Sequence, residues 1–327
     1  MKLYNTLSAA AQAALIEKAE KKRLTLSFYK YAAIGNIGIF RDHIFIAWNA
    51  IGVLGRIHVA KEGINAQLSV PADNFTAFKD HLDSISFLKL KIKVRDKILA
   101  DGLNDAAFNV TDTGTHVDAR TFNRLAETSD TVILDMRNHY ESEIGHFKNA
   151  VTPDVDTFRD SLAVIEEALK DHKADKKLLM YCTGGIRCEK ASAYYKHRGF
   201  KQVYQLEGGI INYVRQVREQ GLENKFIGKN FVFDERRAER ISDDVIARCH
   251  QCGQPCDTHV NCANEACNLL FIQCEACAET MNHCCSAECV TIAALPYEEQ
   301  KALRKGAYKE RLVFKKGRSQ ALSYKKA

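Results

Sequence analysis

The sequence lacks any apolar run long enough to span a bilayer, and its first residues contain no apolar stretch typical of a secretory signal. Motifs for flavin, haem, iron or nucleotide binding are also missing. We therefore expect a cytoplasmic chain that contacts no membrane and holds none of these cofactors. With 327 residues, 46% of them hydrophobic and 27% charged, it has the composition of a globular protein with two or three domains.

Acidic residues are almost absent from the end of the chain. From Lys301 to Ala327 there are ten Lys or Arg residues and one acid, Glu310, which gives a local charge of +9. The whole chain carries +6, so the remainder carries about −3. Such a tail is either a solvated, disordered segment or a contact for an anionic partner such as RNA.

The pattern that points most directly to chemistry surrounds Cys182. The apolar run Leu178–Tyr181 predicts a short buried strand and residues 187–198 predict a helix, so Cys182 is expected in the loop between them. Unpaired amides at a helix N-terminus, the helix dipole and a nearby guanidinium all lower the pKa of a thiol. We predict a thiolate or persulfide here, rather than a small buried structural cysteine. We predict Cys182 and Arg187 as the catalytic residues. The predicted loop that binds an anion or substrate comprises Thr183, Gly184, Gly185 and Ile186.

Two neighbours of this loop have alternative interpretations. Cys188 is either a thiol that resolves a persulfide or disulfide on Cys182, or a buried packing residue in the first turn of the helix. Asp135 and Arg137 follow the predicted strand 132–135. They either orient substrate or form an internal ion pair that supports the loop.

The loop belongs to a region of alternating strand-like and helix-like segments, which predicts a parallel α/β sheet with its ligands beyond the strand C-termini. Upstream, the order βαββαβ predicts a ferredoxin-like sandwich, with a helix starting at Asp73 and running to about Ser84. Glu62 and Asn65 are either substrate contacts there or parts of a hairpin that needs Gly63.

Most of the twelve cysteines lie in one block near the C-terminal end. With clustered spacing and no signal sequence, metal binding is favoured over disulfides. Two Cys-x-x-Cys pairs about twenty-five residues apart predict one structural zinc site, formed by Cys249, Cys252, Cys274 and Cys277. A second ion is an open alternative, as are other ligand pairings and an iron–sulfur cluster. The candidates for a second site are Cys256, Cys262, Cys267, Cys284, Cys285 and Cys289, with His259 or His283.

Two resemblances follow from these motifs. Residues 117–222 resemble a rhodanese domain, in which the loop cysteine carries sulfur as a persulfide; the matching segments are Asp135-x-Arg137, Tyr140-Glu141, the Cys182 loop and Leu206-Glu207-Gly208-Gly209. Four residues separate Cys182 from Arg187, one fewer than in related phosphatase loops, which favours sulfur chemistry over phosphate ester hydrolysis.

Residues 22–291 resemble the bacterial tRNA uridine hydroxylase family. The resemblance rests on the segments 24–31, 62–67, 93–96, 135–141, 181–192, 226–236 and 249–253. It implies oxygen-dependent conversion of uridine 34 to 5-hydroxyuridine, tRNA bound through its anticodon loop as partner, molecular oxygen as co-substrate and no DNA. The alternatives are a persulfide-carrying sulfurtransferase that uses thiosulfate, and a noncatalytic RNA-binding adaptor.

The resulting domain prediction has six parts. They are a helical lead-in at 1–22, a ferredoxin-like (acylphosphatase-like) domain at 23–100, a linker at 101–116, a rhodanese domain at 117–222, a cysteine-rich zinc module at 223–291 and a basic tail at 292–327.

Overall fold

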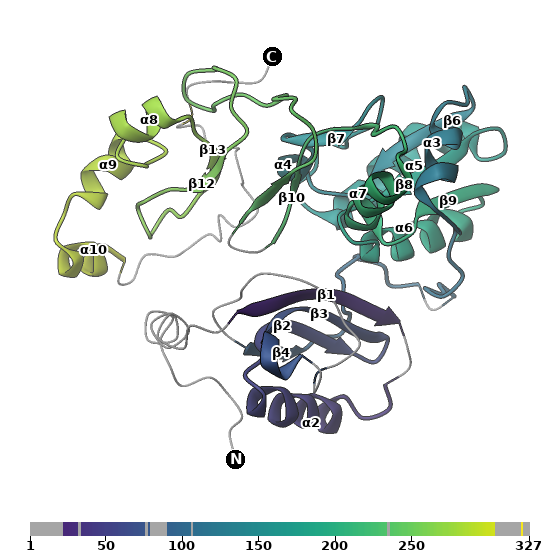
Figure 1. Ribbon diagram of the computed structural model, residues 1–327, viewed down its shortest axis with the longest axis horizontal. Coiled ribbons are helices and arrows are strands. Elements are labelled where there is room, and N and C mark those ends of the chain that lie inside the picture. The colour runs from purple at the N-terminus through teal and green to yellow at the C-terminus, as the bar shows by residue number, and fades with distance from the viewer. Residues whose placement is uncertain are drawn as a thin grey trace. The chain divides into compact units, whose positions relative to one another are not determined.

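The structure is a computed structural model that describes residues 22–31, 34–75, 78, 90–105, 107–233, 236–304 and 322. The chain divides into two compact units (Figure 1). Met1–Asp105 with Phe233–Arg236 form the first, and Ala106–Val232 with Arg237–Ala327 form the second. Nearly all of the predicted helical lead-in and most of the basic tail lie outside the described residues.

A four-stranded sheet with a helix on one face forms the first unit (Figure 1). Apolar side chains of the strands, such as Leu26, Ile57 and Leu68, form a buried core with Ile44 of the helix. The predicted mixed α/β class is confirmed. The elements are β1 (Arg23–Tyr31), α2 (Ile37–Ala50), β2 (Leu54–Ala60), β3 (Gly63–Pro71), η1 (Ala72–Asn74) and β4 (Leu90–Val94), and the strand order is β1-β3-β2-β4.

Two further details of this unit concern its last strand and the segment after Pro71. β4 pairs in parallel with β2 and lies at the sheet edge. Asp73 lies inside the 3-10 turn η1, and the helix expected from Asp73 to about Ser84 falls almost entirely outside the described residues.

The β2–β3 hairpin depends on Gly63. This residue has φ +145°, and a Cβ there would lie 2.0 Å from the carbonyl oxygen of Lys30 on β1. The neighbouring Glu62 carboxylate accepts a hydrogen bond from the amide of Ile98 at 2.8 Å. These contacts are structural, and they agree with the hairpin interpretation of the Glu62–Asn65 turn.

The second unit is built on a parallel four-stranded sheet with the order β5-β9-β8-β6. Its central strand β8 has four successive fully buried residues, Leu178 to Tyr181, because helices cover both faces of such a sheet. Helix α3 contacts α7, and α5 contacts α6. The elements are β5 (Thr115–Val117), α3 (Ala119–Ala126), β6 (Thr131–Asp135), α5 (Phe158–Leu169), η2 (Lys170–His172), β8 (Lys177–Tyr181), α6 (Ile186–His197), β9 (Gln202–Leu206) and α7 (Gly209–Gln220).

A second, three-stranded sheet joins this region to the cysteine-rich segment. Its order is β11-β10-β7, and Phe226 of β10 pairs with Phe147 of β7. Lys229 of β10 forms an ion pair at 2.6 Å with Asp257, which follows β11 in the sequence. The cysteine-rich segment is therefore part of the second unit. The remaining elements are α4 (His139–Ser142), β7 (Gly145–Phe147), β10 (Phe226–Phe231), β11 (Ala238–Arg240), β12 (His259–Asn261), β13 (Leu270–Ile272), α8 (Glu275–Thr280), α9 (Ala287–Ala293) and α10 (Tyr297–Arg304).

Within the part of the chain that the structure describes, none of the helices combines the length and the apolar character needed to cross a membrane.

Candidate active site

Cys182 follows the last residue of β8 and precedes a three-residue loop that leads into α6. The loop closes through Gly185, which has φ +98° and serves as the N-cap of α6. The amide of Gly185 donates a hydrogen bond to Cys182 Sγ at 3.1 Å. The sulfur thus lies where the sequence placed it, at the N-terminal end of a helix.

The Cys182 thiol is 1% exposed. Burial is the largest single effect and raises its pKa, but hydrogen bonds from the Cys188 thiol and from the amides of Cys188 and Arg187 oppose it, as does the charge of Arg187. Together these contacts lower the pKa of Cys182 from 9.0 to about 6. These contacts favour the ionised form of the thiol and offset the effect of burial.

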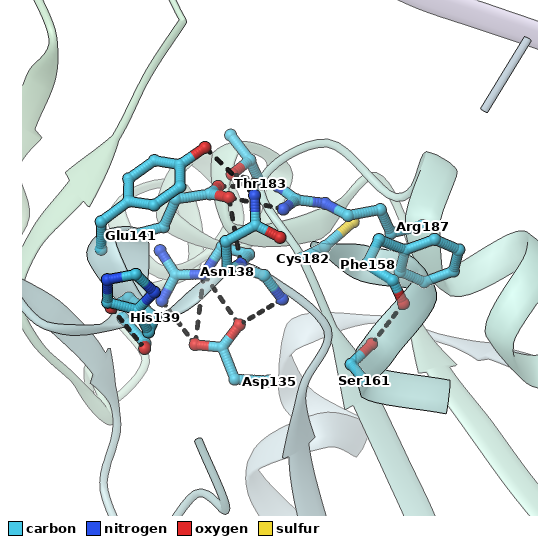
Figure 2. A network of polar contacts seen from close by, with 12 residues as sticks. Asp135, Asn138, His139, Glu141, Phe158, Ser161, Cys182, Thr183 and Arg187 are labelled. Atoms are coloured by element: carbon cyan, nitrogen blue, oxygen red, sulfur yellow. Dashed lines mark hydrogen bonds and ion pairs between the residues drawn. The ribbon is translucent and has the colours of Figure 1, made fainter. Parts of the chain in front are cut away.

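Arg187 is held by a carboxylate from another element. Its Nη1 and Nη2 atoms donate to Oε1 and Oε2 of Glu141 at 2.6 and 2.8 Å, and Nη2 lies 3.4 Å from Thr183 Oγ1 (Figure 2). Glu141 is fully buried and also accepts a hydrogen bond from the Asn138 amide at 3.1 Å. A bidentate pair fixes the orientation of the guanidinium and so keeps its positive charge in one position, where it lowers the pKa of Cys182.

Asp135 and Arg137 form a second buried ion pair, next to Tyr181 at the end of β8. Arg137 Nε and Nη2 donate to the Asp135 carboxylate at 2.9 and 2.6 Å, and neither side chain is exposed. The hydroxyl of Tyr181, the residue before Cys182, donates to Asp135 Oδ2 at 2.7 Å. Arg137 also donates to the carbonyl oxygen of Gly145 at 2.6 Å. The pair is therefore bonded to other buried groups, and its contact with Tyr181 holds the C-terminal end of β8 in place.

Cys188 is 0% exposed in the first turn of α6. Burial, followed by its hydrogen bond to Cys182 and the charge of that group, raises its pKa well above the ordinary value. Cys188 is consequently a neutral thiol that donates to the neighbouring thiolate.

The outer rim of the loop is more open. Thr183, Gly184 and Ile186 are partly exposed, and a Cβ on Gly184 would meet no atom within 4 Å. The inner side is packed against α7, where the amide of Ile210 donates to the Cys182 carbonyl oxygen at 3.0 Å. A cavity of about 380 Å³ runs along α7, lined by residues that include Ile211, Arg218 and Asn230 but not by Cys182.

Eight cysteines form two groups, each with its sulfur atoms within 4.8 Å of one another. Thiolates that bind one tetrahedral zinc at about 2.3 Å lie about 3.8 Å apart. The observed Sγ–Sγ distances are 3.6 Å for Cys252–Cys274, 3.7 Å for Cys267–Cys285 and 3.8 Å for Cys285–Cys289. Both groups therefore fit a metal such as zinc. The first group is Cys249, Cys252, Cys274 and Cys277, and the second is Cys262, Cys267, Cys285 and Cys289.

The pairing alternates along the chain, since residues 262 and 267 lie between the two halves of the first group. Of the candidates for a second site, Cys256 and Cys284 are outside both groups. His259 and His283 are also absent from them.

Sequence reasoning missed two residues of the site. Glu141 was part of a matching segment, but nothing local indicated that it binds Arg187. Gly209 has φ +65°, and a Cβ there would lie 2.5 Å from the Cys182 carbonyl oxygen and 2.6 Å from that of Thr183. The adjacent glycines at 208 and 209 were the available signal for this close approach.

Three domain families match the chain. Residues 23–126 match the UPF0176 acylphosphatase like domain, residues 118–216 match the rhodanese-like domain, and residues 227–290 match the domain described as rhodanase C-terminal. These matches agree with the two sheets and the cysteine-rich segment described above.

Full-length relatives are similar over nearly the whole chain. A tRNA uridine(34) hydroxylase of Leptospira interrogans is 50% identical over 320 residues, which are 93% of this chain and 87% of the relative. Proteins of the same name from Pectobacterium carotovorum and Escherichia fergusonii are 50% and 48% identical over 334 residues. Those alignments cover 97% of this chain and 94% and 95% of the relatives.

Proposed function

The chain belongs to the tRNA uridine(34) hydroxylase family, and on that premise we propose that it converts uridine at tRNA position 34 to 5-hydroxyuridine, with the Cys182 thiolate as its reactive group. One observation carries the assignment of the residue. In the region that matches a rhodanese-like domain, Cys182 has its pKa lowered to about 6 at a helix N-terminus. A lowered thiol pKa in such a setting is typical of a nucleophile and not of a packing residue.

Cys182 would act by adding to C6 of the uracil ring. A C6–S bond forms as the C5–C6 double bond opens, and the electron pair moves toward C5, which then reacts with an oxygen species. Loss of the C5 proton and departure of the thiolate from C6 restore the double bond. Splitting the substitution in this way replaces one difficult step by two easier ones.

The overall reaction balances with molecular oxygen and a thiol-class reductant. One oxygen atom enters at C5, and the other leaves as water after accepting two electrons and two protons. Cys182 and Cys188 are hydrogen-bonded to each other. Once the Cys182 thiolate has left C6, closing a disulfide between the two would release two electrons and the proton of Cys188, and the second proton would come from solvent. Cys188 is thus the candidate resolving thiol, and an external thiol would reopen the pair.

The neighbouring residues would stabilise the thiolate form of Cys182 and control the access of the uracil base to it. Arg187, held by Glu141, keeps positive charge beside the sulfur, while Thr183, Gly184 and Ile186 form the exposed rim. Because Cys182 is 1% exposed, the rim must move before a base can reach it. An anticodon-loop base is already unstacked or easily extruded, which suits such a site.

Zinc would serve the structure of the cysteine-rich segment. Each group of four thiolates would hold one ion, which would stabilise a segment with a small apolar core. The basic residues after Lys301 would add phosphate contacts, with an affinity that falls as salt rises.

Nucleoside mass spectrometry tests the proposed activity. A strain that lacks this chain should lose 5-hydroxyuridine from its tRNA and recover it when the gene is restored, but only when oxygen is present. Unchanged 5-hydroxyuridine in the strain without the chain would contradict the proposal.

The second candidate is a persulfide-carrying sulfurtransferase, favoured by the match of residues 118–216 to a rhodanese-like domain. Transfer of sulfur from thiosulfate to cyanide measures it directly. A chain with strong transfer activity and no effect on tRNA nucleosides would support this candidate over hydroxylation.

A further inference from the structure

Helix α4 (His139–Ser142) lies between the Cys182 loop and the cysteine-rich segment. It has four residues, and a single isolated helical turn is unstable in water because fixing its backbone angles costs more than one hydrogen bond returns. Its geometry must therefore come from its neighbours. The contacts on its two sides show which neighbours these are.

On one side, α4 presents Glu141 to the active site. The side chain accepts a hydrogen bond from the Asn138 amide and binds both terminal nitrogens of Arg187. Glu141 is 0% exposed and Arg187 is 7% exposed, so neither has room to swing into solvent. A displacement of α4 would therefore move Arg187 relative to Cys182.

On the other side, the C-cap residue of α4 is Glu143, whose carboxylate Oε1 lies 3.1 Å from His250 Nε2. The amide of Ile272 donates to His250 Nδ1 at 3.3 Å, so Nδ1 carries no proton. Nε2 is then the ring nitrogen that carries a proton and donates to the Glu143 carboxylate. His250 is 7% exposed, and this hydrogen bond to a charged partner is largely shielded from water.

The position of His250 depends on the first cysteine group. It lies between Cys249 and Cys252, and its own amide donates to the carbonyl oxygen of Ile272 at 2.9 Å. A second connection passes through the ring of Phe231. This ring makes T-shaped contacts with Tyr140 of α4 and with His259, and the ring centroids are 5.2 Å apart in each case. The cysteine-rich segment thus reaches α4 directly through His250 and indirectly through Phe231 of β10.

We propose that His250 and Glu143 are positioning residues, which connect the first cysteine group to α4 and so hold Glu141 and Arg187 in place beside Cys182. The proposal rests on the function proposed for Cys182, and it assigns the cysteine-rich segment a role in the reactivity of a thiol that it does not touch. The titratable and charged groups that act on that thiol are Arg187 and Cys188 on α6, and those that act on Arg187 in turn are Glu141 and Tyr140 on α4.

The test measures alkylation of Cys182 by iodoacetamide in the metal-loaded full chain, followed by mass spectrometry of the Cys182 peptide across the pH range. The midpoint of the rate profile reports the pKa of the thiol, while the plateau at high pH reports access to it. No tRNA is needed, so the readout is independent of hydroxylation.

In Glu143→Ala we expect the midpoint to rise above the wild-type value. A rise in the pKa of Cys182 from about 6 to about 7 would lower the thiolate fraction at pH 6 about fivefold. Glu143→Gln retains an oxygen that can accept from His250 Nε2 and should keep the midpoint close to wild type. Glu167→Ala removes a carboxylate from an exposed ion pair with Lys170 and is the matched control.

The possible outcomes separate the two claims. A wild-type midpoint near the ordinary thiol value would refute the proposed state of Cys182 itself. A low wild-type midpoint that Glu143→Ala leaves unchanged would refute the positioning role alone. If Glu143→Ala does not fold, Glu143→Asp, which shortens the side chain by one methylene, must raise the midpoint with metal content unchanged, or the proposal fails.

Discussion

The guanidinium of Arg187 binds both carboxylate oxygens of Glu141, at 2.6 and 2.8 Å, although the two residues are 46 positions apart in the chain. The pair links the helix that follows Cys182 to the short helix that follows β6. Both partners are buried, so the pair is an integral part of the site and not a surface contact.

Glu141→Ala should destabilise the fold by about 3–5 kcal/mol, because it leaves the buried charge of Arg187 without its partner. Glu219→Ala, which removes one end of the exposed ion pair with Arg215, should change stability by less than about 1 kcal/mol. Urea unfolding of both variants measures the difference. Equal effects would show that the Glu141–Arg187 pair is solvated in solution.

Cys188→Ala should raise the pKa of Cys182, because it removes the thiol that donates to the thiolate. The alkylation midpoint of Cys182 should move from about 6 toward the ordinary thiol value. The lowered pKa also means that ionisation stabilises the folded state above the unfolded thiol pKa, and that this contribution is lost as pH falls through about 6. An unchanged midpoint in Cys188→Ala would leave Cys188 with a packing role only.

The purified chain should contain two zinc ions. Cys274→Ser and Cys289→Ser each remove a thiolate from a different group and should each lower the zinc content by about one ion, measured by plasma mass spectrometry. Cys256→Ser is the control, since Cys256 belongs to neither group. Loss of zinc in that control, or retention of both ions in the other two variants, would contradict the groups assigned here.

Gly209→Ala should disturb the Cys182 loop. The new Cβ would lie 2.5 and 2.6 Å from the carbonyl oxygens of Cys182 and Thr183, so the loop has to shift. Gly221→Ala is a close control, because Gly221 has φ +62° but a Cβ there would meet no atom within 4 Å. Both substitutions strain the backbone, by about 1–3 kcal/mol each. Only Gly209→Ala should also change the alkylation rate of Cys182.

Much of the site's local structure was predictable from the sequence. The apolar run before Cys182 and the glycines after it are local signals, and they identified the strand, the loop and the helix that follows. Strand β5 begins at Thr115, inside the predicted linker, and neither it nor α3 was identified. β5 has three residues, too few for an alternating pattern to stand out.

The long-range pairings could not be derived in this way. The contact between Glu141 and Arg187 requires two distant segments to meet, and composition and spacing do not specify such a meeting. The same limit applied to the cysteines. Their spacing allowed several ligand sets. Only the fold separates Cys284, which lies outside both groups, from its neighbour Cys285, whose sulfur faces Cys267 and Cys289.

The most direct test of the central claim compares Cys182→Ala with Cys256→Ser in a strain that lacks the native chain, by mass spectrometry of tRNA nucleosides. With equal amounts of folded protein, Cys256→Ser should restore 5-hydroxyuridine at position 34, and Cys182→Ala should leave it at the level of the strain without the chain. Full restoration of 5-hydroxyuridine by Cys182→Ala would contradict the account, because the thiolate would then not be required for the reaction.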